Sequence, residues 1–318
     1  MLGQAAIGLK TMKLISLMKS AVRRAAGLAR GYQDDAKAVE GYWTGHNVTL
    51  HRSFATREAS LADFHWRNAQ YFRYIDLMPV AGADRLTVLD FGCGPGYDLV
   101  GFASQSRPQR LIGIDVSQSS LAEAKSRLAL HDAEPELYHH DVLQAPLPLP
   151  DASVDLVHSS GVLHHMPTME PALKELRRVL KPGGHAQLMV YHTDSLWLHL
   201  YVAYERQLMR RIDRNLDLLE AFQKSTDGPD CPISRCYTLD AFVKLVSTYG
   251  FEFERFGVAV SAWEMSLLHK RYAAIMDPRL SRESREFLAG LTFDERGLPL
   301  VRQNVHAGID GCYRFRAV

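Results

Sequence analysis

The chain has 318 residues, of which 47% are hydrophobic and 23% charged, as in ordinary soluble globular proteins. Lys plus Arg number 37 against 36 Asp plus Glu, a net charge of +1, and this excludes a general nucleic-acid binder, which needs a large basic excess. Four scattered cysteines indicate a reducing compartment rather than a disulfide framework. No apolar run reaches the roughly 18 residues that would span a bilayer. We therefore expect a soluble, cytoplasmic protein.

Residues 1–33 depart from this balance, because they hold basic residues and no acid. At about 100° per residue, an apolar stripe faces away from most of the cations: Leu14, Leu17, Met18, Ala21, Ala25 and Leu28 against Lys13, Lys19, Arg23, Arg24 and Arg30. This pattern predicts a basic amphipathic helix. It could pack on the protein's own core, contact an anionic membrane surface or act as a targeting segment, and we give packing on the core the most weight.

Residues 34–80 are polar but dense in aromatic rings. Their spacing predicts a helix from about Glu58 to Asp76, which Met78-Pro79 ends because the residue before proline avoids helical geometry. We expect this helix to pack on a sheet. The alternative is that some of the rings form a lid over a ligand.

From Arg85 onward, short apolar runs alternate with helical stretches. The expected strands are Thr87–Phe91, Arg110–Asp115, Glu136–Asp141, Val154–Ser159 and His185–Tyr191. The expected helices lie near Tyr97–Ser104, Ser119–His131 and Met169–Leu180. Apolar strands that alternate with helices predict an α/β fold with a parallel, doubly wound sheet whose two faces are both covered.

The pattern is looser after Tyr191. Helix is expected over Ser195–Lys224, Leu239–Tyr249 and 262–291, with strands at Phe251–Val260 and Gly311–Val318. We accordingly divide the chain into a helical N-terminal segment (1–80), a ligand-binding core (81–194) and a region of cap helices with the last strands of the sheet (195–318).

The strongest motif is Val88-Leu89-Asp90-Phe91-Gly92-Cys93-Gly94-Pro95-Gly96, in which a buried strand runs into glycines and then a helix. Glycines allow a tight turn and let the backbone approach a ligand closely. Asp115 ends the next strand, 23 residues beyond Gly92, where a carboxylate can accept hydrogen bonds from both ribose hydroxyls. The two features predict a site for an adenosine-containing molecule.

Later segments of the sequence indicate which family of adenosine-binding proteins the chain resembles. The turn reads G-x-G-x-G, with Tyr97 where a dinucleotide fingerprint has its third glycine, and four segments follow in order: His140-Asp141-Val142, Leu147–Leu156, Gly161–Pro167 and Leu176–Gly184. Over residues 85–192 the chain resembles class I S-adenosylmethionine-dependent methyltransferases, especially the ubiquinone/menaquinone-biosynthesis type (methyltransferase type 11). The resemblance implies a Rossmann-like sheet of seven strands, the last one antiparallel, with helical insertions that form a cap.

The same resemblance implies the residues that bind S-adenosyl-L-methionine. Asp90 would bind the ammonium group, and the turn with Gly92, Cys93, Gly94 and Gly96 would face the methionine part. Asp115 would bind the ribose and Val116 the adenine. Asp141 would accept from the adenine amino group, Val142 would offer its backbone N–H, and Ser160 and Gly161 would contact the carboxypropyl arm. The alternative role for Asp115 and Asp141 is a helix N-cap.

Methyl transfer to a hydroxyl requires alignment and a base, and a histidine has a suitable pKa. The sequence Leu-His-His-Met-Pro is similar to that of sugar O-methyltransferases of this family, in which one histidine of the pair and an aspartate after the fifth strand are implicated. We therefore predict His164 or His165 as the base, with His192 or Asp194 orienting it. The alternative is that the pair only holds the loop.

The acceptor is expected beneath the segments that cover the strand ends. Trp197 and Tyr201 share a helix face there, and Arg235 could hold an anionic group. Cys231 and Cys236, with His199 or His269, might suggest zinc, but no second paired cluster completes a four-ligand site, so we expect no metal.

These features predict an enzyme that methylates a small molecule, at a hydroxyl of a sugar or secondary metabolite, with S-adenosyl-L-homocysteine as the product. A C-methyltransferase on a quinone or lipid precursor is the nearest alternative, and a cofactor-binding regulatory subunit without catalysis is the second. We expect no nucleic-acid partner, since Ser159-Ser160-Gly161 is not the Asn/Asp-Pro-Pro-aromatic motif of base methylation. Contact with a membrane through the basic helix and a homodimer stay open.

Overall fold

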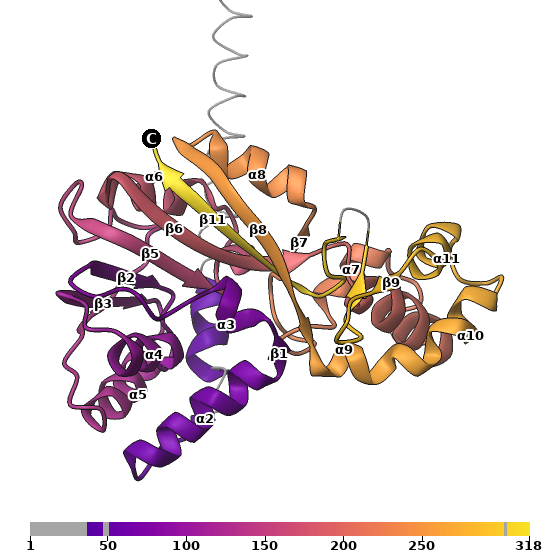
Figure 1. Cartoon of the computed structure of the whole chain (residues 1–318), viewed down its shortest axis with the longest axis horizontal. Coiled ribbons are helices and arrows are strands. Elements are labelled where there is room, and N and C mark those ends of the chain that lie inside the picture. The colour runs from indigo at the N-terminus through magenta and orange to yellow at the C-terminus, as the bar shows by residue number, and fades with distance from the viewer. Residues whose placement is uncertain (1–36, 47–50, 302–303) are drawn as a thin grey trace, which may run out of the picture.

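A computed structural model describes residues 37–46, 51–301 and 304–318 (Figure 1). The predicted basic helix of residues 1–33 lies outside these ranges. In the part of the chain that is described, no helix combines the length and the apolar character needed to cross a membrane.

A nine-stranded sheet dominates the fold, in the order β1-β8-β11-β6-β5-β2-β3-β4, with β7 paired to β6. Its strands are β1 (Tyr71–Phe72), β2 (Thr87–Phe91), β3 (Arg110–Asp115), β4 (Glu136–His139), β5 (Val154–Ser160), β6 (Leu180–His192), β7 (Cys236–Tyr237), β8 (Phe251–Ser261) and β11 (Asp310–Ala317). Strands β2 to β6 are mutually parallel, whereas β11 is antiparallel to both β6 and β8. Without the two-residue strands β1 and β7, this is the predicted Rossmann-like sheet of seven strands with the last one antiparallel.

Helices cover both faces of the sheet (Figure 1). They are α2 (Arg57–Ala69), α3 (Tyr74–Leu77), α4 (Tyr97–Gln105), α5 (Gln118–Ala129), α6 (Glu170–Val179) and α8 (Leu239–Ser247). On one face, Leu173 of α6 and Phe242 of α8 are fully buried against the strands. On the other, Leu99 of α4 packs with Phe64 of α2. The two apolar cores hold the strand ends in fixed positions.

The segment predicted as one helix from Glu58 to Asp76 is broken into three elements. Helix α2 ends at Ala69, Tyr71 pairs with Ser261 as strand β1, and α3 follows. Arg73 adopts a left-handed backbone with φ of 72°, which interrupts the helix. The continuous-helix prediction was wrong because pairing with the edge of β8 outweighs local helical periodicity.

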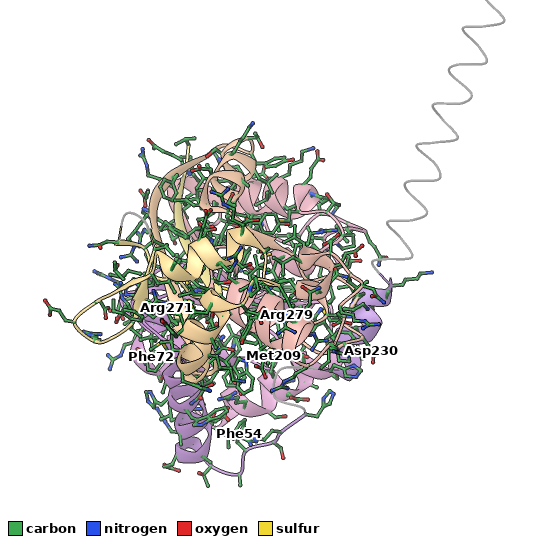
Figure 2. The ribbon with its side chains drawn as sticks, turned by 90° about the vertical axis from the view of Figure 1, so that its right-hand side faces the viewer. Phe54, Phe72, Met209, Asp230, Arg271 and Arg279 are labelled. Atoms are coloured by element: carbon green, nitrogen blue, oxygen red, sulfur yellow. The ribbon has the colours of Figure 1, made fainter. Side chains whose placement is uncertain are left out.

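The insertions after β6 and β8 fold together into a lobe beside the sheet (Figure 1), and Figure 2 looks onto this lobe, with Arg271 and Arg279 labelled. It contains the π-helix η2 (Trp197–Met209), α7 (Leu218–Gln223), α9 (Ala262–Leu267), the 3-10 turn η3 (Leu268–Lys270), α10 (Arg271–Met276), α11 (Arg282–Ala289) and the hairpin β9 (Thr292–Phe293) with β10 (Pro299–Leu300). The regions 195–224 and 262–291, expected to be helical, are thus chains of shorter helices.

Candidate active site

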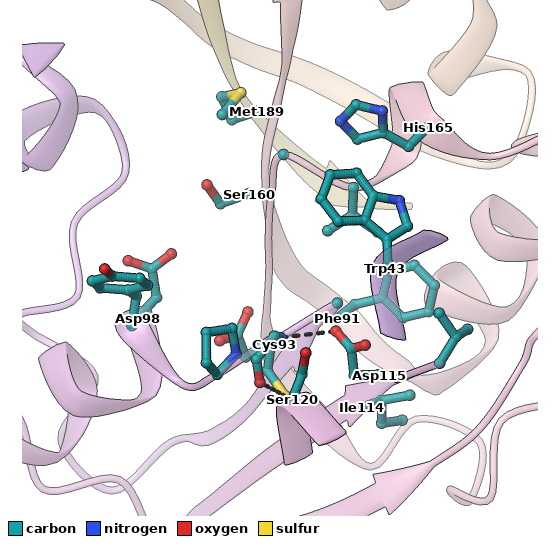
Figure 3. Close-up of a pocket in the computed structure, with 18 of the residues that line it drawn as sticks. Trp43, Phe91, Cys93, Asp98, Ile114, Asp115, Ser120, Ser160, His165 and Met189 are labelled. Carbon is teal, nitrogen blue, oxygen red and sulfur yellow. Dashed lines mark hydrogen bonds between the residues drawn. The ribbon is translucent and has the colours of Figure 1, made fainter. Parts of the chain in front are cut away.

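A cavity of about 420 Å³ lies at the carboxyl edge of the parallel strands (Figure 3). In open α/β sheets this edge is where ligands bind. The cavity is lined by residues of β1, β2, β3, β5, β6 and β11 and of the segment that follows β4. Val39, Glu40 and Trp43 of the helix at 37–45 line it as well. Of the predicted cofactor residues, all except Gly96 line it: Asp90, Gly92, Cys93, Gly94, Asp115, Val116, Asp141, Val142, Ser160 and Gly161.

The glycine turn after β2 forms the floor of the cavity. Gly92 has φ of +76°, and a Cβ there would lie 2.2 Å from Cγ2 of Val162, so a side chain does not fit. Gly94 also has positive φ, but a Cβ on it would meet no atom within 4 Å, because this residue faces open space. Gly96 has a different role, since its Cβ would contact Leu128 and Ala124 of α5. It allows α5 to pack closely against the turn.

Two buried carboxylates beside the turn differ in their partners. Asp98 of α4 accepts hydrogen bonds from Arg67 at 3.0 Å and from His158 at 3.2 Å. Burial alone would raise the pKa of Asp98, but these two partners hold it below its ordinary value. Asp90 is 2% exposed and its carboxylate has no hydrogen bond within the described ranges. Burial raises the pKa of Asp90 to about 7, opposed by the nearby His158. A lining carboxylate without a partner fits the ammonium group of S-adenosylmethionine.

Asp115 and Asp141 both accept local backbone hydrogen bonds. The Asp115 carboxylate accepts from the N–H groups of Gly94 and Ser117, each at 2.8 Å. Asp141 accepts from the N–H of Leu143 at 2.9 Å and the amide of Gln144 at 2.8 Å. These bonds orient the side chains and leave lone pairs available, since a carboxylate has about four acceptor sites. A structural role in the turns and a ligand-binding role are therefore compatible here.

The two histidines of the pair have different surroundings. His165, in the 3-10 turn η1 (Leu163–His165), lines the cavity, and the Trp43 ring lies 4.9 Å from its ring (Figure 3). Its Nδ1 lies 2.6 Å from the carbonyl oxygen of Ile233. Because a carbonyl only accepts, Nδ1 carries the proton and Nε2 is the basic nitrogen. Burial lowers the pKa of His165, although Asp227 and the Ile233 carbonyl act in the opposite direction.

His164 does not line the cavity. It is fully buried between the rings of His165 and Tyr191, whose centroids lie 4.1 and 4.0 Å from the centroid of the His164 ring. Neither ring nitrogen has a hydrogen-bond partner in the part of the chain that is described. Burial lowers its pKa well below the ordinary value, so the ring is neutral. Of the two predicted bases, only His165 can reach a ligand.

The predicted orienting residues His192 and Asp194 do not contact His165. Successive strand residues point to opposite faces, and on β6 it is Tyr191 that faces the cavity. His192 points to the other face, where its Nδ1 lies 3.0 Å from the Tyr237 carbonyl oxygen. The carboxylate next to His165 is instead Asp227, whose Oδ2 lies 3.6 Å from Nε2. It comes from the loop between α7 and β7.

The predicted acceptor residues Trp197, Tyr201 and Arg235 also lie outside the cavity lining. Trp197 donates from its indole to Ser225 and packs on Tyr201, with ring centroids 4.9 Å apart. Arg235 donates to the carbonyl oxygen of Met166 at 2.8 Å, so it holds the loop that carries His165. The π-helix turns its aromatic face toward the lobe rather than toward the strand ends.

Several lining residues were not singled out from the sequence: Arg67, Met189, Tyr191, Asp227 and Asp310. Trp43, Tyr71 and Tyr74 also line the cavity, and they belong to the aromatic rings of residues 34–80 for which a lid was the alternative. One of the residues that were not singled out had a usable signal. The first residue of an antiparallel last strand lies at the edge where the parallel strands end, and Asp310 holds this position in β11. Asp227 had none, because its loop is placed only by tertiary contacts.

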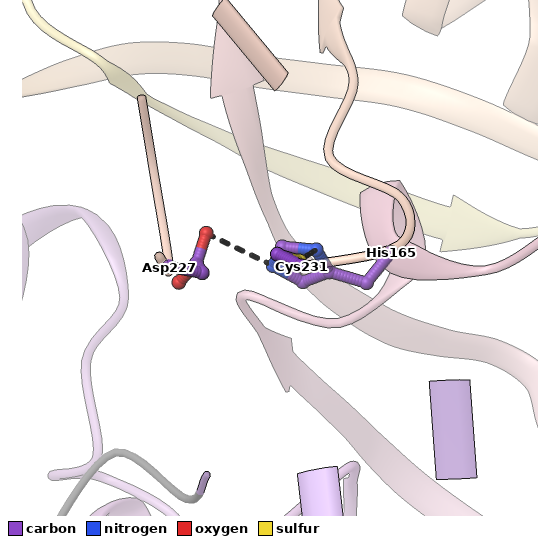
Figure 4. Close-up of side chains that lie close together, drawn as sticks. All are labelled: His165, Asp227 and Cys231. Atoms are coloured by element: carbon purple, nitrogen blue, oxygen red, sulfur yellow. Dashed lines mark hydrogen bonds and ion pairs between the residues drawn. The ribbon is translucent and has the colours of Figure 1, made fainter. Parts of the chain in front are cut away.

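His165, Asp227 and Cys231 form a compact cluster with one donor atom from each within 4.8 Å (Figure 4). It differs from the cysteine and histidine set weighed for zinc, since neither Cys236, His199 nor His269 takes part. Nδ1 of His165 is already bound to the Ile233 carbonyl, and burial raises the pKa of the Cys231 thiol to about 12. With a protonated thiol and a committed Nδ1, the cluster is suited to hold the imidazole in one orientation.

Residues 88–184 match the family model described as a methyltransferase domain. Among curated relatives, the chain is 40% identical over 136 residues to an uncharacterized 37.1 kDa protein in transposon TN4556 of Streptomyces fradiae, covering 41% of this chain and 38% of the relative. It is 31% identical over 162 residues to 27-O-demethylrifamycin SV methyltransferase of Amycolatopsis mediterranei, covering 51% of this chain and 57% of the relative.

Among solved structures, an S-adenosylmethionine-dependent methyltransferase from Mesorhizobium loti has a TM-score of 0.47 and 20% identity, covering 77% of this chain and 97% of that one. The chain spans 38% to 59% of the length of the first four curated relatives. The matched segment holds the glycine turn, Asp115, Asp141 and the histidine pair. Residues 88–184 therefore match a methyltransferase domain, and over part of its length the chain is similar to a curated methyltransferase.

Proposed function

We propose that this protein transfers a methyl group from S-adenosylmethionine to a hydroxyl of a small molecule, a sugar or secondary metabolite, with His165 as the general base. The observation that carries the proposal is the orientation of His165. Its Nδ1 is held by the Ile233 carbonyl, so the basic Nε2 belongs to a ring that lines the cavity.

When bound, the cofactor supplies an electrophilic methyl group on a sulfonium, and S-adenosylhomocysteine is the product. Asp90 would hold its ammonium group and Asp115 its ribose, while Asp141 would meet the adenine. The glycine turn would let the backbone approach the methionine part. These contacts align the methyl carbon with the acceptor oxygen, which accounts for most of the catalysis that a transfer of this kind needs.

His165 would accept the hydroxyl proton at Nε2 as the oxygen–carbon bond forms. Because burial lowers its pKa, the ring is neutral and able to act as a base at neutral pH. Asp227, 3.6 Å from Nε2, would stabilise the imidazolium that results. Trp43 and its helix at 37–45 would exclude water, since Trp43 packs on His165 and Tyr42 donates a hydrogen bond to the backbone carbonyl of Asp227.

The test is a screen of metabolite extracts with isotopically labelled methyl donor, followed by mass spectrometry of the labelled products. We expect a labelled O-methyl product that depends on His165. Label on a carbon would favour the C-methyltransferase alternative. Binding of the cofactor without any labelled product would favour the regulatory subunit, and absence of cofactor binding would refute both the proposal and these alternatives.

A further inference from the structure

A carboxylate that the cofactor does not account for lies at the far end of the cavity. Asp310 is the first residue of β11 and pairs with Tyr191 of β6, so the two side chains share one face of the sheet. Asp310 lines the cavity and is 2% exposed. Its position therefore combines deep burial with access to a ligand.

The carboxyl group of Asp310 has no hydrogen-bonded partner among the described residues. Within residues 37–46, 51–301 and 304–318, no hydrogen bond or ion pair reaches its side chain, whereas the nearby Glu264 accepts from the N–H groups of Trp197, Ser261 and Ile309. A buried carboxylate without a partner carries a large desolvation cost. Folding alone gives no reason for this residue, and a ligand group that donates hydrogen bonds would supply one.

The ammonium group of the cofactor is too far away to be that ligand. It is expected at Asp90 on β2, and β5 and β6 lie between β2 and β11. At a spacing of about 4.8 Å between neighbouring strands, the two sites are separated by about 14 Å. Asp310 therefore belongs to the part of the cavity that would hold the acceptor.

This part of the cavity is lined by carboxyl groups and by aromatic rings. Asp227 lines it too, and accepts a hydrogen bond from the Tyr191 hydroxyl at 2.9 Å. Arg67 also lines the cavity and acts electrostatically on Asp310, but its guanidinium is ion-paired with Asp98 at 3.0 Å. Aromatic faces such as that of Tyr191 attract alkylammonium groups. The carboxyl groups and the aromatic ring that line this part of the cavity thus favour a cationic ligand.

We propose that the acceptor carries a protonated amine, which Asp310 binds with help from Asp227 while its hydroxyl faces His165. The substrate class is then an amino alcohol, such as an amino sugar. This inference rests on the proposed function. A neutral polyol, to which a protonated Asp310 would donate a hydrogen bond, is the competing ligand that the experiment must separate.

The experiment is calorimetry on the full chain saturated with S-adenosylhomocysteine, so that no turnover occurs. The probes are two matched pairs, glucosamine with glucose and tyramine with 4-ethylphenol, in which only one member carries an amine. In at least one pair we expect the amine to bind about tenfold or more tightly than its neutral partner, the size of a charge-assisted hydrogen bond. Equal binding in both pairs, or binding of no amine, overturns the proposal.

Asp310→Asn should reduce that preference to less than about threefold, and Asp230→Asn should leave it intact. Asp230 is the matched control because it is exposed on the same loop as Asp227 (Figure 2) and does not line the cavity. A preference that persists in Asp310→Asn also overturns the proposal. If that variant does not fold, Asp227→Asn provides the second measurement. Failure of S-adenosylhomocysteine to bind in the first titration would instead refute the proposed function.

Discussion

Replacing His165 by asparagine separates its chemistry from its structural role. The amide of the introduced asparagine would lie near the position of Nδ1 and can still donate to the Ile233 carbonyl, while Nε2 is lost. A positioned general base contributes about 100- to 10,000-fold to a rate, or about 3–5 kcal/mol at about 1.36 kcal/mol per tenfold change. We expect kcat/KM to fall by this factor for the acceptor that the labelling screen identifies, with cofactor affinity changed less than about threefold.

The adjacent His164→Leu variant is the matched control. Neither nitrogen of His164 has a partner in the described ranges, and such a buried polar group costs about 1–3 kcal/mol. Its contact with the Tyr191 ring is worth about 0.5–1.5 kcal/mol. The two effects oppose each other and differ by about 1 kcal/mol in favour of the variant, so we expect Tm to be unchanged or slightly raised and kcat/KM to stay close to that of the unmodified protein.

Steady-state kinetics, with calorimetry of cofactor binding on the same preparations, decides the matter. Full activity in His165→Asn would refute the assignment of the base. If His164→Leu lost activity while its Tm was preserved, the assignment of His165 rather than His164 as the base would be wrong.

Three further predictions concern the cofactor site and the pH profile. Asp90→Asn should weaken S-adenosylmethionine binding by about 10- to 150-fold, the loss of a hydrogen bond to a charged group. Because the pKa of Asp90 is about 7, calorimetry on the unmodified protein should show that the affinity for S-adenosylmethionine rises as the pH increases through 7. An affinity that does not change with pH would contradict this prediction. Gly92→Ala should lower Tm and cofactor affinity, because its Cβ would lie 2.2 Å from Val162, and Val162→Ala should restore part of the loss unless backbone strain dominates. With S-adenosylmethionine saturating, so that Asp90 does not limit the rate, kcat should fall on the acidic side only below pH 6.5, since burial lowers the pKa of His165. Asp227→Asn should move that acidic limb to still lower pH by removing a charge that raises this pKa; movement to higher pH would contradict the assigned interaction between His165 and Asp227.

Local sequence was sufficient for the cofactor half of the site. Strand β2, the glycine turn and α4 are contiguous, so the order of residues places Asp90 and Gly94 together. The same holds for Asp115, which ends β3 beside that turn. The expected element boundaries agree with the structure there to within a residue or two, because buried apolar strands and glycine positions are strong local signals.

Segments distant in sequence decided which residues lie beside His165, in the part of the cavity where we propose that the acceptor binds. The resemblance to sugar O-methyltransferases favoured His192 and Asp194 as partners of His165, but strand alternation turns His192 to the opposite face. Asp227, 62 residues beyond His165 in the chain, lies beside the ring instead. Trp197 and Tyr201 were predicted from their shared helix face, but their rings pack within the lobe and do not line the cavity.

The sequence alone therefore determined β2, β3, the glycine turn and the carboxylates beside it, because each lies within one strand–turn–helix unit. Only the tertiary structure decided which histidine faces the cavity and that Asp227 accompanies it, and it brought Asp310, which strand position alone could have indicated, to the same cavity. Those residues come from a loop and a strand far apart in sequence. Their positions depend on packing between elements, which no local pattern of residues encodes.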